Sequence, residues 1–349
     1  MSADSRRRQI IGRALLLVVF LLSLYLVAPG LLALFGDLPK LRDVNPLWFV
    51  AVFVFESLAF VSIWELTRIA LGTNRWFDVG CSQLAGNALS RALPGGAATG
   101  GTTQFQMLTR AGFAPARTTT VLTAVGILST ATLLVLPIFA LPPIMLRIVV
   151  PQHQLLRGAI LAAILGMFVL GGGVVLLVSD RVVRAVGALV DRVLRLVRRR
   201  NPPQRSVSEM VLEARDFVRE ALEENWKRAL PAAFGNQVFD FLALLTCAYA
   251  VGGHPEPVLV LLAYVAAAAL AMIPITPGGL GFVEAGLTGV LALSGLPGDL
   301  AVLTTLLYRL FSYWLPLPAG LVASALFARR HRNREHGAAA PLEPTPPTT

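Results

Sequence analysis

Charged residues are scarce in this sequence, and their scarcity excludes an ordinary water-soluble globular protein. Only 14% of the 349 residues are charged, whereas 55% are hydrophobic and the mean hydropathy is +0.68. Soluble domains carry about 25% charged residues. A protein with so few needs a surface that faces something other than water. We therefore predict an all-α polytopic membrane protein with no room for a separate soluble catalytic domain.

Cysteine, histidine and lysine are also rare. The two cysteines, Cys81 and Cys247, lie within or beside apolar runs, and the four histidines are scattered, so neither a disulfide framework nor a metal site is predicted and no cofactor is expected. Only two of the 30 basic residues are lysines. The basic residues cluster between the apolar runs and at both ends. Their distribution indicates membrane orientation and not nucleic-acid binding, despite a net charge of +10.

Six long apolar runs are each sufficient to cross about 30 Å of hydrocarbon. The first is too long for the apolar region of a cleaved signal peptide, so it is predicted to remain as a membrane span. The six predicted spans are Ile10–Phe35, Leu47–Leu71, Thr118–Leu141, Leu155–Val178, Leu230–Val251 and Leu300–Phe327.

The basic residues predict which side each connection faces. The arginines near the N-terminus, Arg75, residues 181–228 and residues 329–334 should all be cytoplasmic. Both termini would then lie on the cytoplasmic side of a bacterial inner membrane. Residues 180–228 have the pattern of amphipathic helices on the inner leaflet. We expect one membrane domain over residues 1–336 and a disordered tail over 337–349, which is rich in Ala, Pro and Thr.

Two further apolar stretches are interrupted by proline and glycine, and they occupy equivalent positions. Pro94-Gly95-Gly96 and Pro277-Gly278-Gly279 lie 183 positions apart, as do Gly112 and Gly295. The same shift aligns residues 47–141 with residues 230–328, each a span, a broken hairpin and a span. Three spans separate the two hairpins, so the second unit should be inverted relative to the first. We predict an inverted repeat whose hairpins are re-entrant or cross the membrane twice.

Charged side chains inside the predicted spans need a physical reason, since each costs at least about 2.5–3.5 kcal/mol at a helix centre. Arg309 lies about 15 Å into its span, too deep to reach water easily. An internal ion pair and a contact with substrate both remain open for it. Glu56 and Asp240 occupy similar depths in the two repeat-related spans. Arg91 precedes the first glycine run by three positions, and Glu284 follows the second by three.

Other polar residues have simpler explanations. Glu65 and Arg68 are one helical turn apart and should form a local ion pair. Asn236 and Gln237 are expected to form hydrogen bonds between helices. The glycine runs have two interpretations. They free backbone amides at half-helix starts, where an anion can bind, or they only permit close helix packing.

The second hairpin resembles a known family. Residues 273–284 read IPITPGGLGFVE and are followed by Gly295 and by Tyr308-Arg309. This pattern is similar to the lysylphosphatidylglycerol synthase transmembrane-region family, the flippase-like membrane domain of bacterial multiple-peptide-resistance proteins. The stretch from Asn87 to Leu108 resembles that family's first hairpin. The resemblance extends over roughly Gly12 to Arg329.

The resemblance implies movement of a lipid between leaflets, and it also shows two departures. The soluble aminoacyl-transferase domain of the resistance proteins is expected to be absent. Many members have a Gly-Glu pair and an arginine after the first proline, where this sequence reads GGTTQFQ from Gly100 to Gln106. The cargo is therefore expected to differ from the aminoacylated lipid.

Together these observations predict a flippase and not an enzyme, with an anionic phospholipid or a polyprenyl-phosphate lipid as its partner. A lipid-modifying membrane enzyme and a scaffold for a lipid or glycan synthase remain the alternatives. The sequence leaves open whether the chain forms a homo-oligomer. The residues predicted to line the substrate site are Arg91, Arg309, Glu56, Asp240, Glu284, Asn87, Tyr308, Pro94, Gly95, Gly96, Pro277, Gly278, Gly279 and Gly281.

Overall fold

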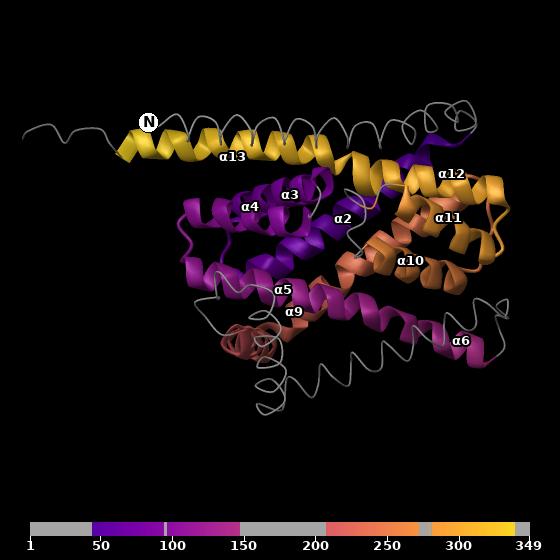
Figure 1. Ribbon diagram of the computed structural model, residues 1–349, viewed down its shortest axis with the longest axis horizontal. Coiled ribbons are helices and arrows are strands. Elements are labelled where there is room, and N and C mark those ends of the chain that lie inside the picture. Colours follow the sequence, from indigo (N-terminus) through magenta and orange to yellow (C-terminus); the bar gives the residue numbers. More distant parts are fainter. Residues whose placement is uncertain (1–43, 94–95, 147–206, 272–278, 280, 339–349) are drawn as a thin grey trace, which may run out of the picture.

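A computed structural model describes residues 44–93, 96–146, 207–271, 279 and 281–338, all of them in helices or short connections (Figure 1). Within these residues, four helical segments are long and apolar enough to cross a membrane: Pro46–Leu71, Pro115–Met145, Lys227–Ala250 and Gly298–Arg332. They coincide with four of the six predicted spans. The spans predicted at Ile10–Phe35 and Leu155–Val178, the amphipathic helix at 180–200 and the tail from residue 339 lie outside the described residues.

The first unit begins with α2 (Pro46–Leu71). Asn45 caps this helix by accepting a hydrogen bond from the Leu47 N–H at 3.0 Å, and Pro46 occupies the first helical position, where no backbone donor is needed. α2 ends at Gly72, whose φ of 59° is a left-handed conformation that glycine adopts without steric cost. Capping at both ends therefore fixes the limits of a helix whose composition is mostly apolar.

The first broken hairpin consists of α3 (Trp76–Ala92) and α4 (Gly96–Arg110). A β-carbon on Gly86 would lie 2.8 Å from the Gly100 carbonyl oxygen, and one on Gly100 would lie 2.5 Å from the Gly86 carbonyl oxygen. Only glycine permits this approach between the two helices. Close packing is thus one established role of the glycines in this hairpin.

A long helical segment follows the hairpin. It consists of α5 (Pro115–Val135), the short 3₁₀ helix η2 (Leu136–Ala140) and α6 (Leu141–Met145). Proline at position 137 lacks a backbone donor and its ring crowds the preceding turn, which accounts for the change of helix type there.

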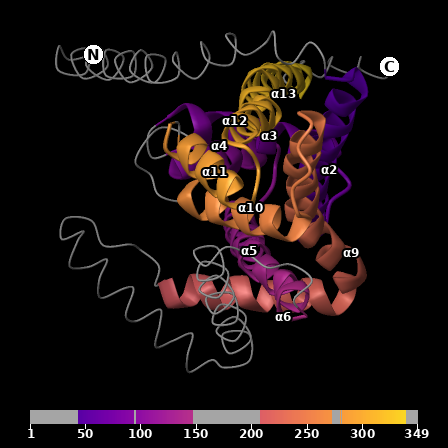
Figure 2. The same ribbon diagram turned by 90° about the vertical axis from the view of Figure 1, so that its right-hand side faces the viewer.

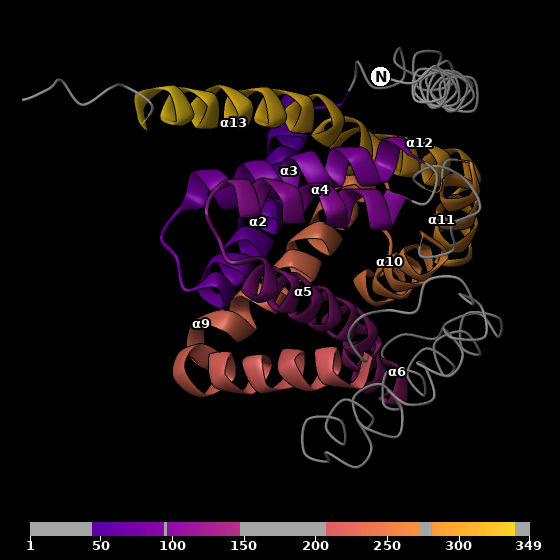
Figure 3. The same cartoon turned by 60° about the vertical axis from the view of Figure 1, so that its left-hand side comes forward.

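The second unit begins with α9 (Val207–Ala250), one continuous helix that contains Pro231. The sequence predicted a cytoplasmic helix and a separate span starting at Leu230, so the continuity is a difference from that prediction. Figures 2 and 3 show that the ribbon of α9 changes direction between its first part and its membrane-spanning part. Pro231 cannot donate to the carbonyl four residues earlier, which explains a bend without a break.

The remaining elements complete the second unit. α10 (Pro257–Ala271) and α11 (Phe282–Leu293) flank the proline–glycine segment, and α12 (Gly298–Arg309) follows. The last span then continues through η4, a π-helical turn at Leu310–Trp314, into α13 (Pro316–Ala338).

The two units end their corresponding helices in the same way. α4 ends at Gly112 and α11 at Gly295, with φ of 95° and 99°. In both cases the glycine N–H donates to the carbonyl three residues earlier, and the next N–H, of Phe113 or Leu296, donates to the carbonyl five residues earlier. The same pair of bonds ends α2 and α9 at Gly72 and Gly252. Gly112 and Gly295 are 183 positions apart, so the sequence correspondence there extends to local backbone geometry. Gly72 and Gly252 are 180 positions apart and share only the type of helix ending.

The first helices of the two units, α2 and α9, pack against each other in opposite directions. The start of α2 packs against the end of α9 in a cluster that contains Phe49, Val52 and Cys247. At the other end of α2, Glu65 pairs with Arg228, at the start of the spanning part of α9. The α3–α4 and α10–α11 pairs lie on opposite sides of this crossing (Figure 1), and α13 packs on α3. The polar residues described below lie where these elements meet.

Candidate functional site

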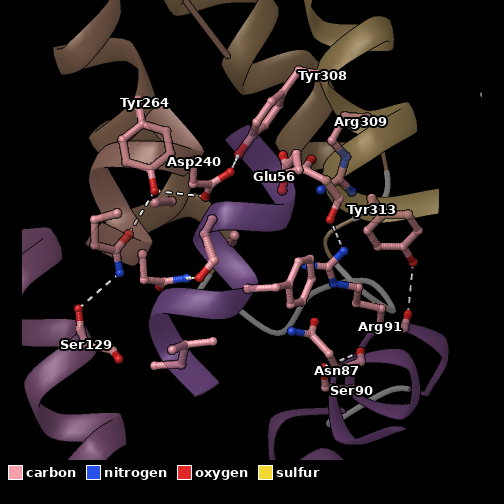
Figure 4. Close-up of a pocket in the computed structure, with 18 of the residues that line it drawn as sticks. Glu56, Asn87, Ser90, Arg91, Ser129, Asp240, Tyr264, Tyr308, Arg309 and Tyr313 are labelled. Atoms are coloured by element: carbon pink, nitrogen blue, oxygen red, sulfur yellow. Dashed lines mark hydrogen bonds between the residues drawn. The ribbon is translucent and has the colours of Figure 1, made fainter. Parts of the chain in front are cut away.

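A polar cavity of about 510 Å³ lies between the two units, within the membrane-spanning helices. Side chains of α2, α3, α5, α9, α10, α12 and η4 line it, so both units contribute (Figure 4). The predicted site residues that line the cavity are Glu56, Asn87, Arg91, Asp240, Tyr308 and Arg309. These residues come from four elements, α2, α3, α9 and α12, and are separated by up to about 250 positions, yet they converge on one space.

Asp240 is held by two tyrosines. Tyr308 donates a hydrogen bond to Oδ1 at 2.8 Å, and Tyr264 donates to Oδ2 at 2.9 Å. Figure 4 shows the carboxyl group between the two phenol rings. The Tyr264 hydroxyl also lies 2.8 Å from Gln237 Oε1, so these two acceptors share its single proton. Hydrogen bonds to a carboxylate are stronger than neutral ones, so these contacts compensate part of the cost of placing Asp240 inside the membrane.

Arg91 is anchored across the interface between the units. Its guanidinium donates to the backbone carbonyl of Ser312, and its own carbonyl accepts from the Tyr313 hydroxyl at 2.9 Å. In an α-helix the Ser312 carbonyl would accept from the N–H of residue 316, but that residue is proline and has no N–H. The proline therefore leaves the Ser312 carbonyl oxygen without its helical donor, and Arg91 donates a hydrogen bond to it.

Arg309 forms an ion pair with Glu284, with 2.7 Å between Nε and Oε1. Its guanidinium carbon also lies 4.2 Å from the centre of the Tyr313 ring, a cation–π contact. Of the two interpretations that the sequence left open for Arg309, the internal ion pair is therefore present. Arg309 also lines the cavity, so a contact with substrate is sterically available to it.

Glu284 and the glycines have positions that the sequence did not predict. Glu284 is not among the residues that line the cavity. Its Oε2 accepts from the Gly281 N–H at 2.7 Å, so its own carboxylate occupies the anion position at the start of α11. Gly96, Gly279 and Gly281 do not line the cavity either, and Pro94, Gly95, Pro277 and Gly278 lie outside the described residues.

Glu56 differs from the other charged residues of the cavity. Only 5% of its surface is exposed, and its Oε1 has no hydrogen-bond partner among the described residues. Asp240 and Arg91 are the charged groups that act most strongly on it. A buried carboxyl oxygen without a partner is energetically costly, so its retention at this depth suggests a functional reason.

Several lining residues were not predicted from the sequence. Tyr264 is the polar side chain in an otherwise apolar helix, α10, and that isolation was a usable signal. Ser90, Ser312 and Tyr313 gave no such signal, since hydroxyl groups are common in membrane helices. Three of the five tyrosines of the chain line this cavity: Tyr264, Tyr308 and Tyr313.

Simple structural predictions for other polar residues are confirmed. Glu65 and Arg68 pair at 2.9 Å. Asn236 donates to the Ala59 carbonyl at 3.0 Å and Gln237 to the Ser129 carbonyl at 3.2 Å, both between helices. These bonds join α9 to α2 and α5 beside the cavity, so they also fix its walls.

Chemically, the cavity combines two guanidinium groups, two carboxyl groups and several hydroxyl groups. Such a mixture suits a polar group that bears charge, such as a phosphate, with hydrogen-bond donors or a positive charge nearby. In a membrane, a space lined in this way is occupied by water or by a polar ligand, because lipid chains would leave its charges unsolvated.

Comparison with known proteins gives a family match. A family model described as the lysylphosphatidylglycerol synthase TM region matches residues 9–320. One similar protein is a UPF0104 membrane protein of Methanothermobacter thermautotrophicus, 30% identical over 98 residues. That alignment covers 28% of this chain and 28% of the other protein. The family resemblance drawn from the second hairpin is confirmed.

Proposed function

Because the chain belongs to the lysylphosphatidylglycerol synthase transmembrane-region family, we propose that it moves a phosphate-containing lipid between membrane leaflets through the polar cavity. The observation that carries this proposal is the convergence of Arg91 and Arg309 on one cavity within the spanning helices. A guanidinium group binds phosphate oxygens through several N–H donors. The cargo class is an anionic phospholipid or a polyprenyl-phosphate lipid.

Each polar group has a role in this proposal. Arg91 and Arg309 hold the phosphate, while Asn87 and Tyr308 offer further hydrogen bonds. Glu56 and Asp240 balance the two positive charges while the cavity is empty of cargo. Glu284 positions Arg309 through their ion pair and does not touch the lipid.

We also propose that the two units form an inverted repeat with the cavity at their interface, in a bacterial inner membrane with both termini cytoplasmic. The opposite directions of α2 and α9 support the inversion, and the matching glycine ends of corresponding helices support the repeat. Sites at the interface of inverted repeats are typical of transporters.

Reconstitution into liposomes tests the function. Phosphatidylglycerol with a fluorescent headgroup is incorporated, and a membrane-impermeant quencher reports how much label reaches the outer leaflet. We expect label to exchange between leaflets while the lipids stay chemically unchanged. Chemical conversion of the lipid would indicate an enzyme. If neither phosphatidylglycerol nor a polyprenyl phosphate is exchanged or converted, the result would contradict transport and favour the scaffold function.

Arg309→Ala tests the site. We expect exchange to slow by about tenfold or more, equivalent to ~1.4 kcal/mol. Arg117→Ala removes an exposed arginine of α5 that does not line the cavity, and it should exchange lipid at the wild-type rate. If Arg309→Ala matches wild type at equal incorporation, the assignment of the phosphate site is wrong.

A further inference from the structure

A second, apolar cavity of about 370 Å³ lies beside the polar one. We call it the lateral groove. It is lined by one side of α2 and by residues of α3, η4 and α13: Phe53, Glu56, Ser57, Phe60, Val61, Trp64, Leu84, Phe311, Leu315, Pro316 and Ala319. Apart from Glu56 and Ser57, these side chains are apolar or aromatic.

The lateral groove and the polar cavity meet at α2. Glu56 and Phe60 line both spaces, so the two adjoin at these side chains. η4 contributes to both as well: Ser312 lines the polar cavity, and the neighbouring Phe311 lines the groove. One turn of helix thus separates a charged compartment from an apolar one.

The outer part of the groove faces the membrane. Phe53, Val61 and Leu315 are 50%, 39% and 40% exposed, and they lie on helices that are apolar enough to span a bilayer. Exposed aromatic and aliphatic side chains at this position contact hydrocarbon chains and not water. The groove is therefore accessible from the lipid phase, while Glu56 lines its inner end.

We propose that the lateral groove binds one hydrocarbon chain of the lipid whose headgroup occupies the polar cavity. This inference rests on the proposed lipid transport and adds where the apolar part of the cargo travels. An amphipathic lipid has one polar and one apolar part joined covalently, and the two adjoining spaces have this arrangement. Trp64 lines the groove, and its buried indole N–H has no hydrogen-bond partner among the described residues.

Photocrosslinking tests the groove without relying on transport. Purified protein is reconstituted with phosphatidylglycerol that carries a diazirine in one acyl chain, irradiated, and mapped by mass spectrometry. We expect labelling at Phe53, Val61 and Leu315 to exceed that at Ile127 and Phe139 by about tenfold, although the latter two are 51% and 60% exposed. Equal labelling at both sets would overturn the proposal, because it would reflect only surrounding lipid.

Variants that fill the groove provide the second measurement. Ala319→Phe places a ring inside the groove, whereas Ala325→Phe places one on an exposed position of the same helix. We expect the first to abolish selective labelling and the second to preserve it. Ser57→Phe, on the opposite wall, repeats the test if Ala319→Phe fails to fold. Persistent groove labelling in a folded Ala319→Phe or Ser57→Phe would contradict the proposal.

The outcomes separate this inference from the proposed function. Selective groove labelling without lipid exchange would support a chain-binding groove and argue against transport. Exchange without selective labelling would support transport and refute the groove.

Discussion

At the scale of single residues, three ionisable side chains of the cavity have hydrogen-bond or ion-pair partners, and a fourth has one oxygen without a partner. Asp240 has two tyrosine hydroxyls, Arg309 has Glu284, and Arg91 has a backbone carbonyl. Glu56 retains an oxygen with no partner among the described residues. Satisfied groups can be explained by folding alone, whereas a buried carboxyl oxygen without a partner calls for a further explanation.

Glu56→Gln should separate function from stability. Replacing the carboxyl group by an amide removes a buried ionisable group, so we expect the melting temperature in detergent to stay the same or rise. Lipid exchange should fall by about tenfold or more.

Glu65→Gln is the matched control on the same helix. Glu65 pairs with Arg68 and Arg228 and does not line the cavity, so this variant should lose some stability and keep its exchange rate. If Glu56→Gln instead behaved like Glu65→Gln, Glu56 would be a structural charge only.

The sequence predicted the charged residues of the site better than its hydroxyl groups. Arg91, Glu56, Asp240 and Arg309 stood out because charge is rare in apolar runs. The contact between Arg91 and the Ser312 carbonyl was not predictable, since it joins residues 221 positions apart and depends on a carbonyl without a helical partner. The packing of α13 against α3 brings them together.

At the scale of elements, glycine and proline determine how closely helices approach and where carbonyls become available. In the first hairpin, Gly86 and Gly100 face each other, whereas Gly101, the next residue of α4, has nothing within 4 Å of where a β-carbon would lie. Neighbouring glycines in one helix thus have different roles, which a sequence pattern alone does not distinguish.

Gly86→Ala should destabilise the protein, because its methyl group would lie 2.8 Å from the Gly100 carbonyl oxygen. We expect a cost of about 1–3 kcal/mol, typical of overpacking, as a lower melting temperature in detergent. Gly101→Ala should be neutral or stabilising by up to about 1 kcal/mol, because alanine favours the helix. Equal effects of the two substitutions would show that α3 and α4 do not pack this closely.

Pro316→Ala should change the anchoring of Arg91. An alanine would supply the N–H that proline lacks, and this donor would compete with Arg91 for the Ser312 carbonyl. We expect unchanged or higher thermal stability together with slower lipid exchange. Pro318→Ala restores a donor for the Trp314 carbonyl and should leave exchange unchanged. Wild-type exchange by Pro316→Ala would mean that the proline is not needed to position Arg91.

At the scale of the whole molecule, ion pairs gather at one end of the helical assembly. Arg75 and His331 both contact Asp78, at 2.6 and 3.1 Å, and Glu65 pairs with Arg68 and Arg228 nearby. The end of α13 thereby meets the connection between α2 and α3. The sequence predicted this end to be cytoplasmic because of its basic residues, and that orientation remains a prediction.

Cysteine labelling can test the inverted orientation. Asn74 follows α2 and His254 follows α9, both are exposed, and both native cysteines are buried. In cells, a membrane-impermeant maleimide added outside should label His254→Cys and reach Asn74→Cys only after the membrane is permeabilised. Labelling of both residues from the same side would contradict the inversion.

Much of the helical order was predictable, because apolar runs and glycine breaks are local properties. The four long described segments and both interrupted stretches lie where the sequence predicted them. The continuity of α9 through Pro231 was missed, since a proline marks a helix end as readily as a bend. The position of Glu284 outside the cavity was also missed, because it depends on how α11 turns relative to α12.

The π-helical turn at Leu310–Trp314 also constrains the length of the last span. The Leu315 N–H reaches back five residues to Leu310, so the turn holds one residue more than an α-helical turn. Deleting that residue would rotate α13 by about 100° and shift it by about 1.5 Å relative to α12. Gly320 would then leave its close contact with the Leu84 carbonyl on α3. Any relative with a one-residue gap in this segment would need a compensating change on α3, so such gaps should occur only together with changes at the α3 residues that face position 320.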